Sequence, residues 1–230
     1  MKALVVVLVL LLGLAVLADR VFHGMAEDRV ATELAEKGDL QGTPEVEIAG
    51  FPFLTQALGG RYDDVRISLT AEELGQPAGT RADVALHGVH VPLSSVLSGS
   101  VTEVPVERID GTATLSYDLL AAQLGGDTTL RREGDGLRIT RTVELLGQMI
   151  PLTATGTLTL DGNDLVLDVA NVAGAGVDVP DFLTDRVADR LDLRYAVPVL
   201  PFGLTLSSVT PDDDGVDVRV EATDTVLAAG

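Results

Sequence analysis

The sequence predicts an α+β protein in which a large, curved antiparallel sheet packs on a few amphipathic helices. Several runs after residue 42 alternate apolar and polar residues with period two, as in strands with one buried face. Other stretches have helical spacing. Hydrophobic residues make up 46% of the 230, but aromatic residues only 3%, so the core is aliphatic, which favours strands. This length indicates a single domain, expected over residues 19–230.

The N-terminal segment is the most apolar part of the chain. Lys2 is followed by sixteen uncharged residues, from Ala3 to Ala18, and then by Asp19. At about 1.5 Å per residue these sixteen span roughly 24 Å, less than the roughly 30 Å of a bilayer core. We interpret residues 1–18 as an export signal, which is either cleaved before Asp19 or retained as a membrane anchor. A buried core helix is a weaker alternative, because the segment is apolar on all faces. Either way, we expect the protein to be exported to the periplasm or cell envelope.

Three further stretches have the pattern of amphipathic helices. The first covers residues 19–37 and is ended by Gly38. Its apolar side is expected to consist of Phe22, Met25, Ala26, Val30 and Leu34. The second runs from Ser116, which can cap it, to Gly125. The third begins at Pro180. Its apolar stripe is Leu183, Val187 and Leu191.

Roughly eight to ten strands are expected between the helices. The clearest pattern lies in residues 152–160, where threonines alternate with apolar residues. Turn residues that tolerate positive φ separate the strands. They stand at Asp135–Gly136, at Asp161–Gly162–Asn163 and at Asp214–Gly215. Strands joined by such turns form antiparallel hairpins.

Charge and composition exclude several classes of partner and site. The formal net charge is −19, so nucleic acid is not an expected partner, and a polybasic attraction to anionic membranes is disfavoured. Affinity for lipid would therefore depend on apolar burial. The absence of Cys excludes disulfides, a thiol nucleophile and thiolate metal sites.

No motif in the sequence assigns catalysis, a metal or a cofactor. His87 and His90 are three residues apart in a strand-like run, so they should point to opposite faces unless Gly88 marks a bulge. The aspartates before Gly215 resemble a calcium loop, but Thr210 replaces its first ligand, which favours a solvated hairpin turn. We therefore predict no catalytic residues, no metal site and no cofactor.

Arg141 stands out because it shares the apolar register of its strand. Leu137, Ile139, Val143 and Leu145 occupy that same register. A buried arginine needs an anionic partner, since an unpaired buried charge costs several kcal/mol. The partner would be an internal carboxylate or a lipid phosphate or carboxylate at a cavity mouth, unless the register is slipped. Arg141 is our candidate for binding a lipid head group.

Three stretches of the chain carry a resemblance to a known family. They are "ADRVFHGMAEDRVATEL", "GFPFLTQALGGRYDDVRISL" and "LPFGLTLSSVTPDDDGVDVRVE". In this order they resemble the LmeA-like family of actinobacterial envelope proteins. The resemblance implies an exported or membrane-anchored phospholipid-binding domain, similar in fold to tubular lipid-binding domains, with an acyl-chain groove. It also implies inositol phospholipids or their mannosides as ligands, a role in lipoglycan (mannan) or envelope lipid metabolism, and an envelope glycosyltransferase as a partner.

The apolar residues of these motifs have two interpretations. They form either one end of an ordinary core or the lining of an acyl-chain site. The candidate lining residues are Phe51, Phe53, Leu54, Leu58, Phe182, Leu183, Val187 and Phe202. Carbohydrate modules usually stack sugars on aromatic rings, and this chain has no Trp and three Tyr, so lipid is the expected ligand class.

Two other functions are compatible with the sequence. A lipid-acting hydrolase would need a serine brought close to His87 or His90 in space. The candidate serines are Ser94, Ser95, Ser98 and Ser100. A structural scaffold for envelope enzymes would need only a filled core and a protein partner.

Overall fold

The computed structural model describes residues 2–124, 128–145, 148–162, 164–174, 193–196 and 200–228. Its helices are α1 (Lys2–Lys37), α2 (Phe53–Gly59), α3 (Leu93–Ser98), α4 (Tyr117–Leu124) and the 3₁₀ turn η1 (Pro201–Gly203). Its strands are β1 (Glu45–Ala49), β2 (Arg61–Leu69), β3 (Arg81–His90), β4 (Glu103–Ser116), β5 (Thr128–Glu133), β6 (Gly136–Leu145), β7 (Gln148–Asp161), β8 (Asp164–Gly174), β9 (Leu193–Ala196), β10 (Thr205–Pro211) and β11 (Gly215–Ala228). The predicted α+β class is confirmed, with one strand more than the expected maximum within the described ranges.

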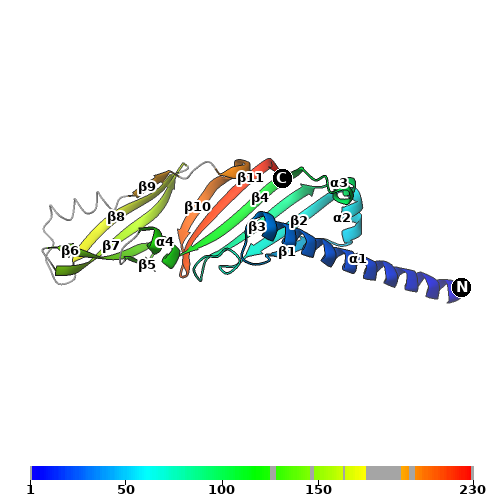
Figure 1. Cartoon of the computed structure of the whole chain (residues 1–230), viewed down its shortest axis with the longest axis horizontal. Coiled ribbons are helices and arrows are strands. Elements are labelled where there is room, and N and C mark those ends of the chain that lie inside the picture. Colours follow the sequence, from blue (N-terminus) through cyan, green and yellow to red (C-terminus); the bar gives the residue numbers. More distant parts are fainter. Residues whose placement is uncertain are drawn as a thin grey trace. The chain divides into compact units, whose positions relative to one another are not determined.

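The strands form two sheets (Figure 1). The first has six strands in the order β1-β2-β3-β4-β11-β10, and the second has five in the order β5-β6-β7-β8-β9. The hairpins β5–β6, β7–β8 and β10–β11 are antiparallel, as the turn residues predict. The pair β6–β7 is also antiparallel, although the sequence analysis named no turn between these strands. β1 is an edge strand, so one side of its backbone needs hydrogen-bond partners from outside the sheet.

The chain divides into two compact units. Unit 1 consists of Met1–Leu69, Asp83–Asp110 and Ala222–Gly230. Unit 2 consists of Thr70–Ala82 and Gly111–Glu221. Each unit has its own buried apolar side chains.

Unit 2 is closed by an aliphatic cluster. Its buried members are Leu137, Ile139, Leu167 and Val216.

The side chain of Ser116 accepts a hydrogen bond from the backbone N–H of Leu119 at 3.3 Å, which confirms the predicted cap of α4. The hydroxyl of Tyr117 donates to the carbonyl oxygen of Asp212 at 2.6 Å, and burial raises the pKa of this tyrosine. The Asp214–Gly215 turn is confirmed, since Asp212 N–H donates to the Gly215 carbonyl oxygen at 2.7 Å.

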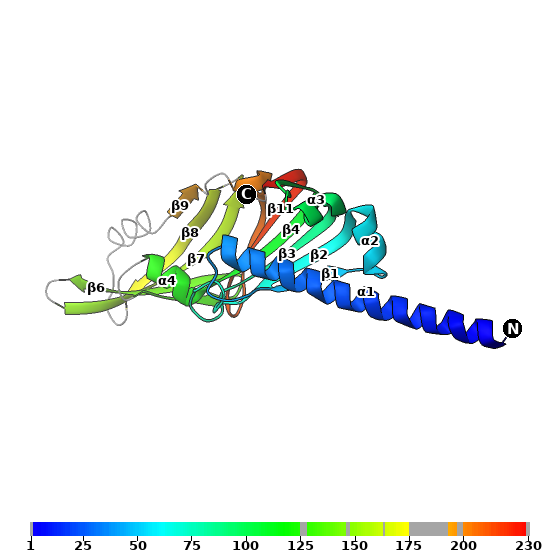
Figure 2. The same ribbon diagram turned by 45° about the vertical axis from the view of Figure 1, so that its right-hand side comes forward.

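In unit 1, α1 lies along the edge strand β1 (Figure 2). The predicted apolar face of this helix is wrong: Phe22 is 53% exposed and Met25 is 61% exposed. The face toward the domain instead carries Asp19, His23, Glu27 and Ala31, at intervals of four residues. Polar side chains take this face because backbone groups of the edge strand need partners.

His23 and Glu27 supply those partners. His23 Nε2 lies 2.7 Å from the carbonyl oxygen of Ile48, and the N–H of Ile48 donates to Glu27 Oε1 at 2.9 Å. The two side chains also contact each other, at 3.1 Å. Helix α1 therefore satisfies the outward-facing backbone groups of Ile48 and protects this edge from pairing with another strand.

Candidate functional site

Two short helices with similar construction lie at one end of unit 1. Each is preceded by a proline, Pro52 for α2 and Pro92 for α3. Each ends at a glycine in the left-handed region, Gly60 with φ of 66° and Gly99 with φ of 64°. The peptide bond before Pro52 is cis. These residues explain locally why both helices are so short.

A backbone hydrogen bond joins the residue that follows α2 to the segment that precedes α3. Val91 N–H donates to the carbonyl oxygen of Gly60 at 2.9 Å. We define residues 49–60 and 91–102 as the α2–α3 end of unit 1. Figures 1 and 2 show that the N-terminal half of α1 extends past this end.

Asp19 attaches α1 to the α2–α3 end. Its side chain is only 3% exposed, and its carboxylate accepts the backbone N–H of Leu54 at 2.8 Å. Leu54 is in the first turn of α2, where backbone N–H groups lack partners within the helix. Gln56 joins α2 to the sheet, donating to the carbonyl oxygen of Ala49 on β1 and accepting from the N–H of Asp63 on β2, both at 3.0 Å.

The two phenylalanines beside Pro52 have different environments. Phe53 is buried, with ring centroids 5.3 Å from His23 and 6.1 Å from Tyr62. Burial in the same region raises the pKa of Tyr62. Phe51 is exposed, and the guanidinium carbon of Arg20 lies 5.3 Å from the centre of its ring. Phe53 therefore belongs to the core, whereas Phe51 faces outward.

The other predicted lining residues are dispersed. Leu54 is partly buried and Leu58 is exposed on α2. Phe202, in η1 of unit 2, is 42% exposed with φ of 59°. Phe182, Leu183, Val187 and the helix predicted to begin at Pro180 lie outside the described residues. The structure therefore places three of the eight candidates, Phe53, Leu54 and Leu58, together on α2, with Phe51 just before it.

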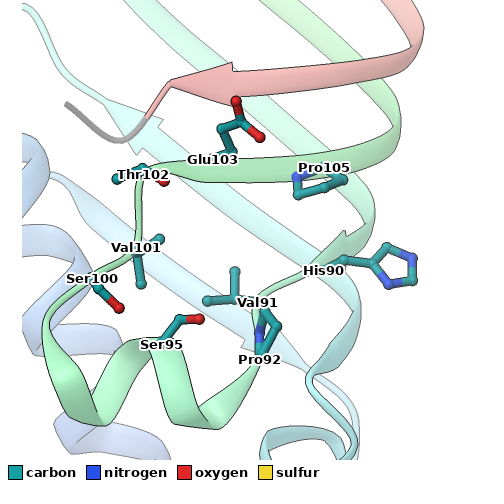
Figure 3. A pocket seen from close by; sticks show the side chains of 9 residues that line it. All are labelled: His90, Val91, Pro92, Ser95, Ser100, Val101, Thr102, Glu103 and Pro105. Carbon is teal, nitrogen blue, oxygen red and sulfur yellow. The ribbon is translucent and has the colours of Figure 1, made fainter.

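An open hollow of about 340 Å³ lies beneath α3 (Figure 3). Its lining residues are His90, Val91, Pro92, Ser95, Ser100, Val101, Thr102, Glu103 and Pro105. Figure 3 shows the side chains of Val91 and Val101 directed toward the middle of the hollow, and His90 directed away from it. The sequence analysis missed both α3 and this hollow, although Pro92 and Gly99 mark the helix ends.

Among the described residues, His87 and His90 each contact a carboxylate of β4. Gly88 has φ of 62° and is buried together with Val89, so the alternation of the strand is broken there. His87 Nε2 lies 3.1 Å from an oxygen of Asp110, and His90 Nε2 lies 3.2 Å from one of Glu107. Among the described residues, no group of three His, Cys, Asp or Glu could hold a metal ion.

The serines near α3 bond to one another and to the backbone of their own helix. Ser98 Oγ donates to the carbonyl oxygen of Ser94 at 2.8 Å and lies 2.7 Å from Ser100 Oγ. Within the described part of the chain, no hydrogen bond joins Ser94, Ser95, Ser98 or Ser100 to either of those histidines. This arrangement offers no activated nucleophile.

Arg141 is exposed, contrary to the expectation of a buried arginine. It lies on β6 between Thr128 of β5 and Leu152 of β7, two residues beyond the buried Ile139. The described members of the buried cluster on this strand are Leu137 and Ile139, and Arg141 is not among them. It makes no ion pair with any described residue, so its binding of a lipid head group stays a prediction.

Comparison with known proteins adds what the geometry alone does not provide. A family model described as LmeA-like phospholipid-binding matches residues 17–221. The chain belongs to this family. Its members' description supports a lipid-binding role with phospholipid as the partner, in agreement with the resemblance stated from the sequence. The chain matched no curated protein and no solved structure.

Asp19→Ala is expected to destabilise the attachment of α1. It leaves the N–H of Leu54 without its acceptor and should cost about 0.5–2 kcal/mol, like the loss of a helix cap. In a chain of this size Tm falls by roughly 2–4 °C per kcal/mol. Thermal unfolding of the full chain in detergent micelles measures the change. Asp19→Asn keeps a side-chain oxygen and should lose less; equal loss for both would contradict the assignment.

Proposed function

We propose that this protein binds phospholipid outside the cytoplasm, held at the membrane by the N-terminal half of α1. The observation that carries the proposal is the exposure of that half. Its described Val and Leu side chains from Val5 to Leu17 are 40–67% exposed. Val5–Lys37 is the one helix in the described part of the chain that is long and apolar enough to cross a membrane. The retained anchor and the cleaved signal are both compatible with this helix.

Continuity with the folded unit favours the anchor. Helix α1 is unbroken from Lys2 to Lys37, and its apolar run ends at Asp19, which is buried against α2. Exposed apolar surface is unfavourable in water at roughly 25 cal/mol per Å², whereas a bilayer covers it. A retained helix would therefore fix unit 1 at the membrane surface through Asp19.

The hollow beneath α3 supports the binding of part of a phospholipid. Its volume of about 340 Å³ lies at the lower end of the range of small-molecule sites, enough for a portion of a lipid. Val91, Pro92, Val101 and Pro105 provide apolar surface, and Ser95 and Ser100 provide hydroxyl groups. We propose that an acyl chain contacts the valines while the glycerol ester region reaches the hydroxyls.

The finer assignments rest on the family resemblance. The ligand would be an inositol phospholipid or one of its mannosides. The process would be lipoglycan (mannan) or envelope lipid metabolism, and the partner an envelope glycosyltransferase. The acidic chain suits a lipid that is held mainly by its apolar part, because its net charge of −19 opposes anionic head groups at long range.

Location outside the cytoplasm can be tested by labelling, since the chain has no Cys. Glu36→Cys places a thiol at an exposed position of α1. In spheroplasts of the host, a membrane-impermeant maleimide should label it without lysis. Labelling that requires lysis would place the protein in the cytoplasm and overturn this part of the proposal.

Lipid binding is tested by native mass spectrometry of the full chain released from detergent, followed by extraction and identification of lipid. We expect one phospholipid per chain. Val101→Phe should fill the hollow and lower occupancy at limiting lipid about tenfold, equivalent to about 1.4 kcal/mol. Val96→Phe, on the exposed side of α3, is the matched control and should retain lipid. If both variants bind alike, the hollow is not the site.

Arg141→Ala tests the head-group assignment separately. An exposed charge contact is worth up to about 1 kcal/mol, so affinity for anionic phospholipid vesicles should fall at most about fivefold, with no change for neutral vesicles. Arg138→Ala is the control, because Arg138 lies on the same strand but pairs with Glu133. Equal effects of the two variants would show a general charge effect and remove Arg141 as a head-group residue.

A further inference from the structure

We propose that the α2–α3 end of unit 1 is a second membrane-contact surface, which inserts into the bilayer beside α1. This inference rests on the proposed function in one respect, the anchoring of α1. It adds a defined surface and fixes which part of the domain faces the membrane. Four observations on different properties of this end carry the inference.

The first observation is the absence of charge. Residues 49–60 and 91–102 contain no Asp, Glu, Lys or Arg. Charged residues make up 22% of the chain, so a segment of twelve residues would ordinarily contain between two and three. Two uncharged segments, far apart in sequence, are joined by the hydrogen bond from Val91 to Gly60. At this end unit 1 thus combines two uncharged segments, followed in the sequence by Arg61 and Glu103, in a chain whose net charge is −19.

The second observation is the exposure of large apolar side chains at this end. Leu58 is 74% exposed and Leu97 is 79% exposed. Both values exceed that of every exposed apolar side chain described in α1, where the highest is 67%. Phe51 and Val96 are also exposed, at 58% and 48%. Apolar side chains grouped on loops and short helices in this way mark a surface that is covered in the functional state.

The third observation is the position at which the apolar segment of α1 ends. Asp19 is the first charged residue after the uncharged segment, and its carboxylate is bonded to α2. The boundary of the anchor therefore lies at α2 and not beyond it. A bilayer that covers Ala3–Ala18 meets the α2–α3 end at its surface.

The fourth observation is the cation beside Phe51. The guanidinium group of Arg20 lies over the Phe51 ring, one residue past the boundary at Asp19. Aromatic rings and arginines are favoured at the level of lipid head groups, where the ring contacts apolar material and the cation contacts phosphate. This pair suits the interface between bilayer and water.

A lipid bilayer accounts for these observations better than a protein partner. The surface is continuous with the apolar half of α1, through the bond between Asp19 and Leu54. Two segments without acidic residues also allow a strongly acidic chain to approach anionic lipids with less repulsion. Shallow insertion of apolar side chains to roughly 5–10 Å places them at the boundary of head groups and acyl chains. The hollow beneath α3 would then open at the membrane surface.

The test uses single cysteines in the full chain, which has none of its own. Leu58→Cys and Leu97→Cys carry spin labels at the proposed contact. Leu11→Cys reports on the anchor, and Glu36→Cys is the distal control, about 26 Å along α1 from Asp19. Each variant is reconstituted in vesicles of phosphatidylcholine and phosphatidylglycerol, and label depth is measured from accessibility to oxygen and to a water-soluble nickel complex.

We expect labels 58 and 97 to lie roughly 5–10 Å below the phosphates, and label 36 to remain in water. If labels 58 and 97 are as accessible to nickel as label 36 while label 11 is protected, this inference is overturned and the anchor is left intact. Exposure of label 11 would instead contradict the anchoring itself. The two failures are therefore distinguishable.

A charge-insertion variant provides a second measurement. The double variant Leu58→Asp, Leu97→Asp introduces carboxylates at two exposed positions. Because neither leucine is part of the core, the fold should be retained. A label at Thr55, exposed on α2, should move from the bilayer into water, while label 11 stays protected. An unchanged depth at Thr55 in this double variant would count against the inference.

Discussion

The hydrogen bonds from one face of α1 to the backbone of unit 1 are the constraint on which the structure around α2 and the edge strand β1 depends. Asp19 holds the first turn of α2, while His23 and Glu27 together satisfy both backbone groups of Ile48 in the edge strand β1. Because these three residues are four apart, they share one helix face. A rotation of α1 by one residue would leave buried backbone groups without partners, so the helix has one permitted orientation.

This orientation explains why apolar residues of α1 are exposed. If polar groups face the domain, Phe22 and Met25 must face away from it. The helix is therefore amphipathic in the opposite sense from a typical surface helix, whose apolar side covers a core. The same attachment determines where the apolar N-terminal half leaves the domain, and so brings the α2–α3 end next to it.

The lipid-binding role is supported by family membership, whereas the proposed binding site is supported by the structure. Family membership over residues 17–221 supports phospholipid as the ligand. The hollow beneath α3 is lined by residues of α3 and of the chain on either side of it, and the sequence analysis did not anticipate it. A site at the membrane surface would allow lipid to be exchanged with the bilayer without passing through water, where exposure of an acyl chain is unfavourable.

The sequence by itself determined the features that depend on neighbouring residues. These include the hairpin turn at Asp214–Gly215, the Ser116 cap of α4 and the apolar run that ends at Asp19. In each case a residue's own backbone preference or side chain decides the outcome. The α+β class followed in the same way, from strand alternation and helical spacing.

The tertiary structure alone decided what depends on partners far away in the chain. The buried face of α1 follows from the needs of Ile48, 25 residues after His23, and periodicity cannot reveal an unpaired strand edge. Arg141 keeps the apolar register of β6 but is exposed, because the cluster that buries Leu137 and Ile139 does not extend to it. The separate environments of Phe51 and Phe53 likewise arise from α1, which packs His23 against Phe53 and places Arg20 over Phe51. Burial is a property of the assembled unit, and a local pattern indicates only which faces could be buried.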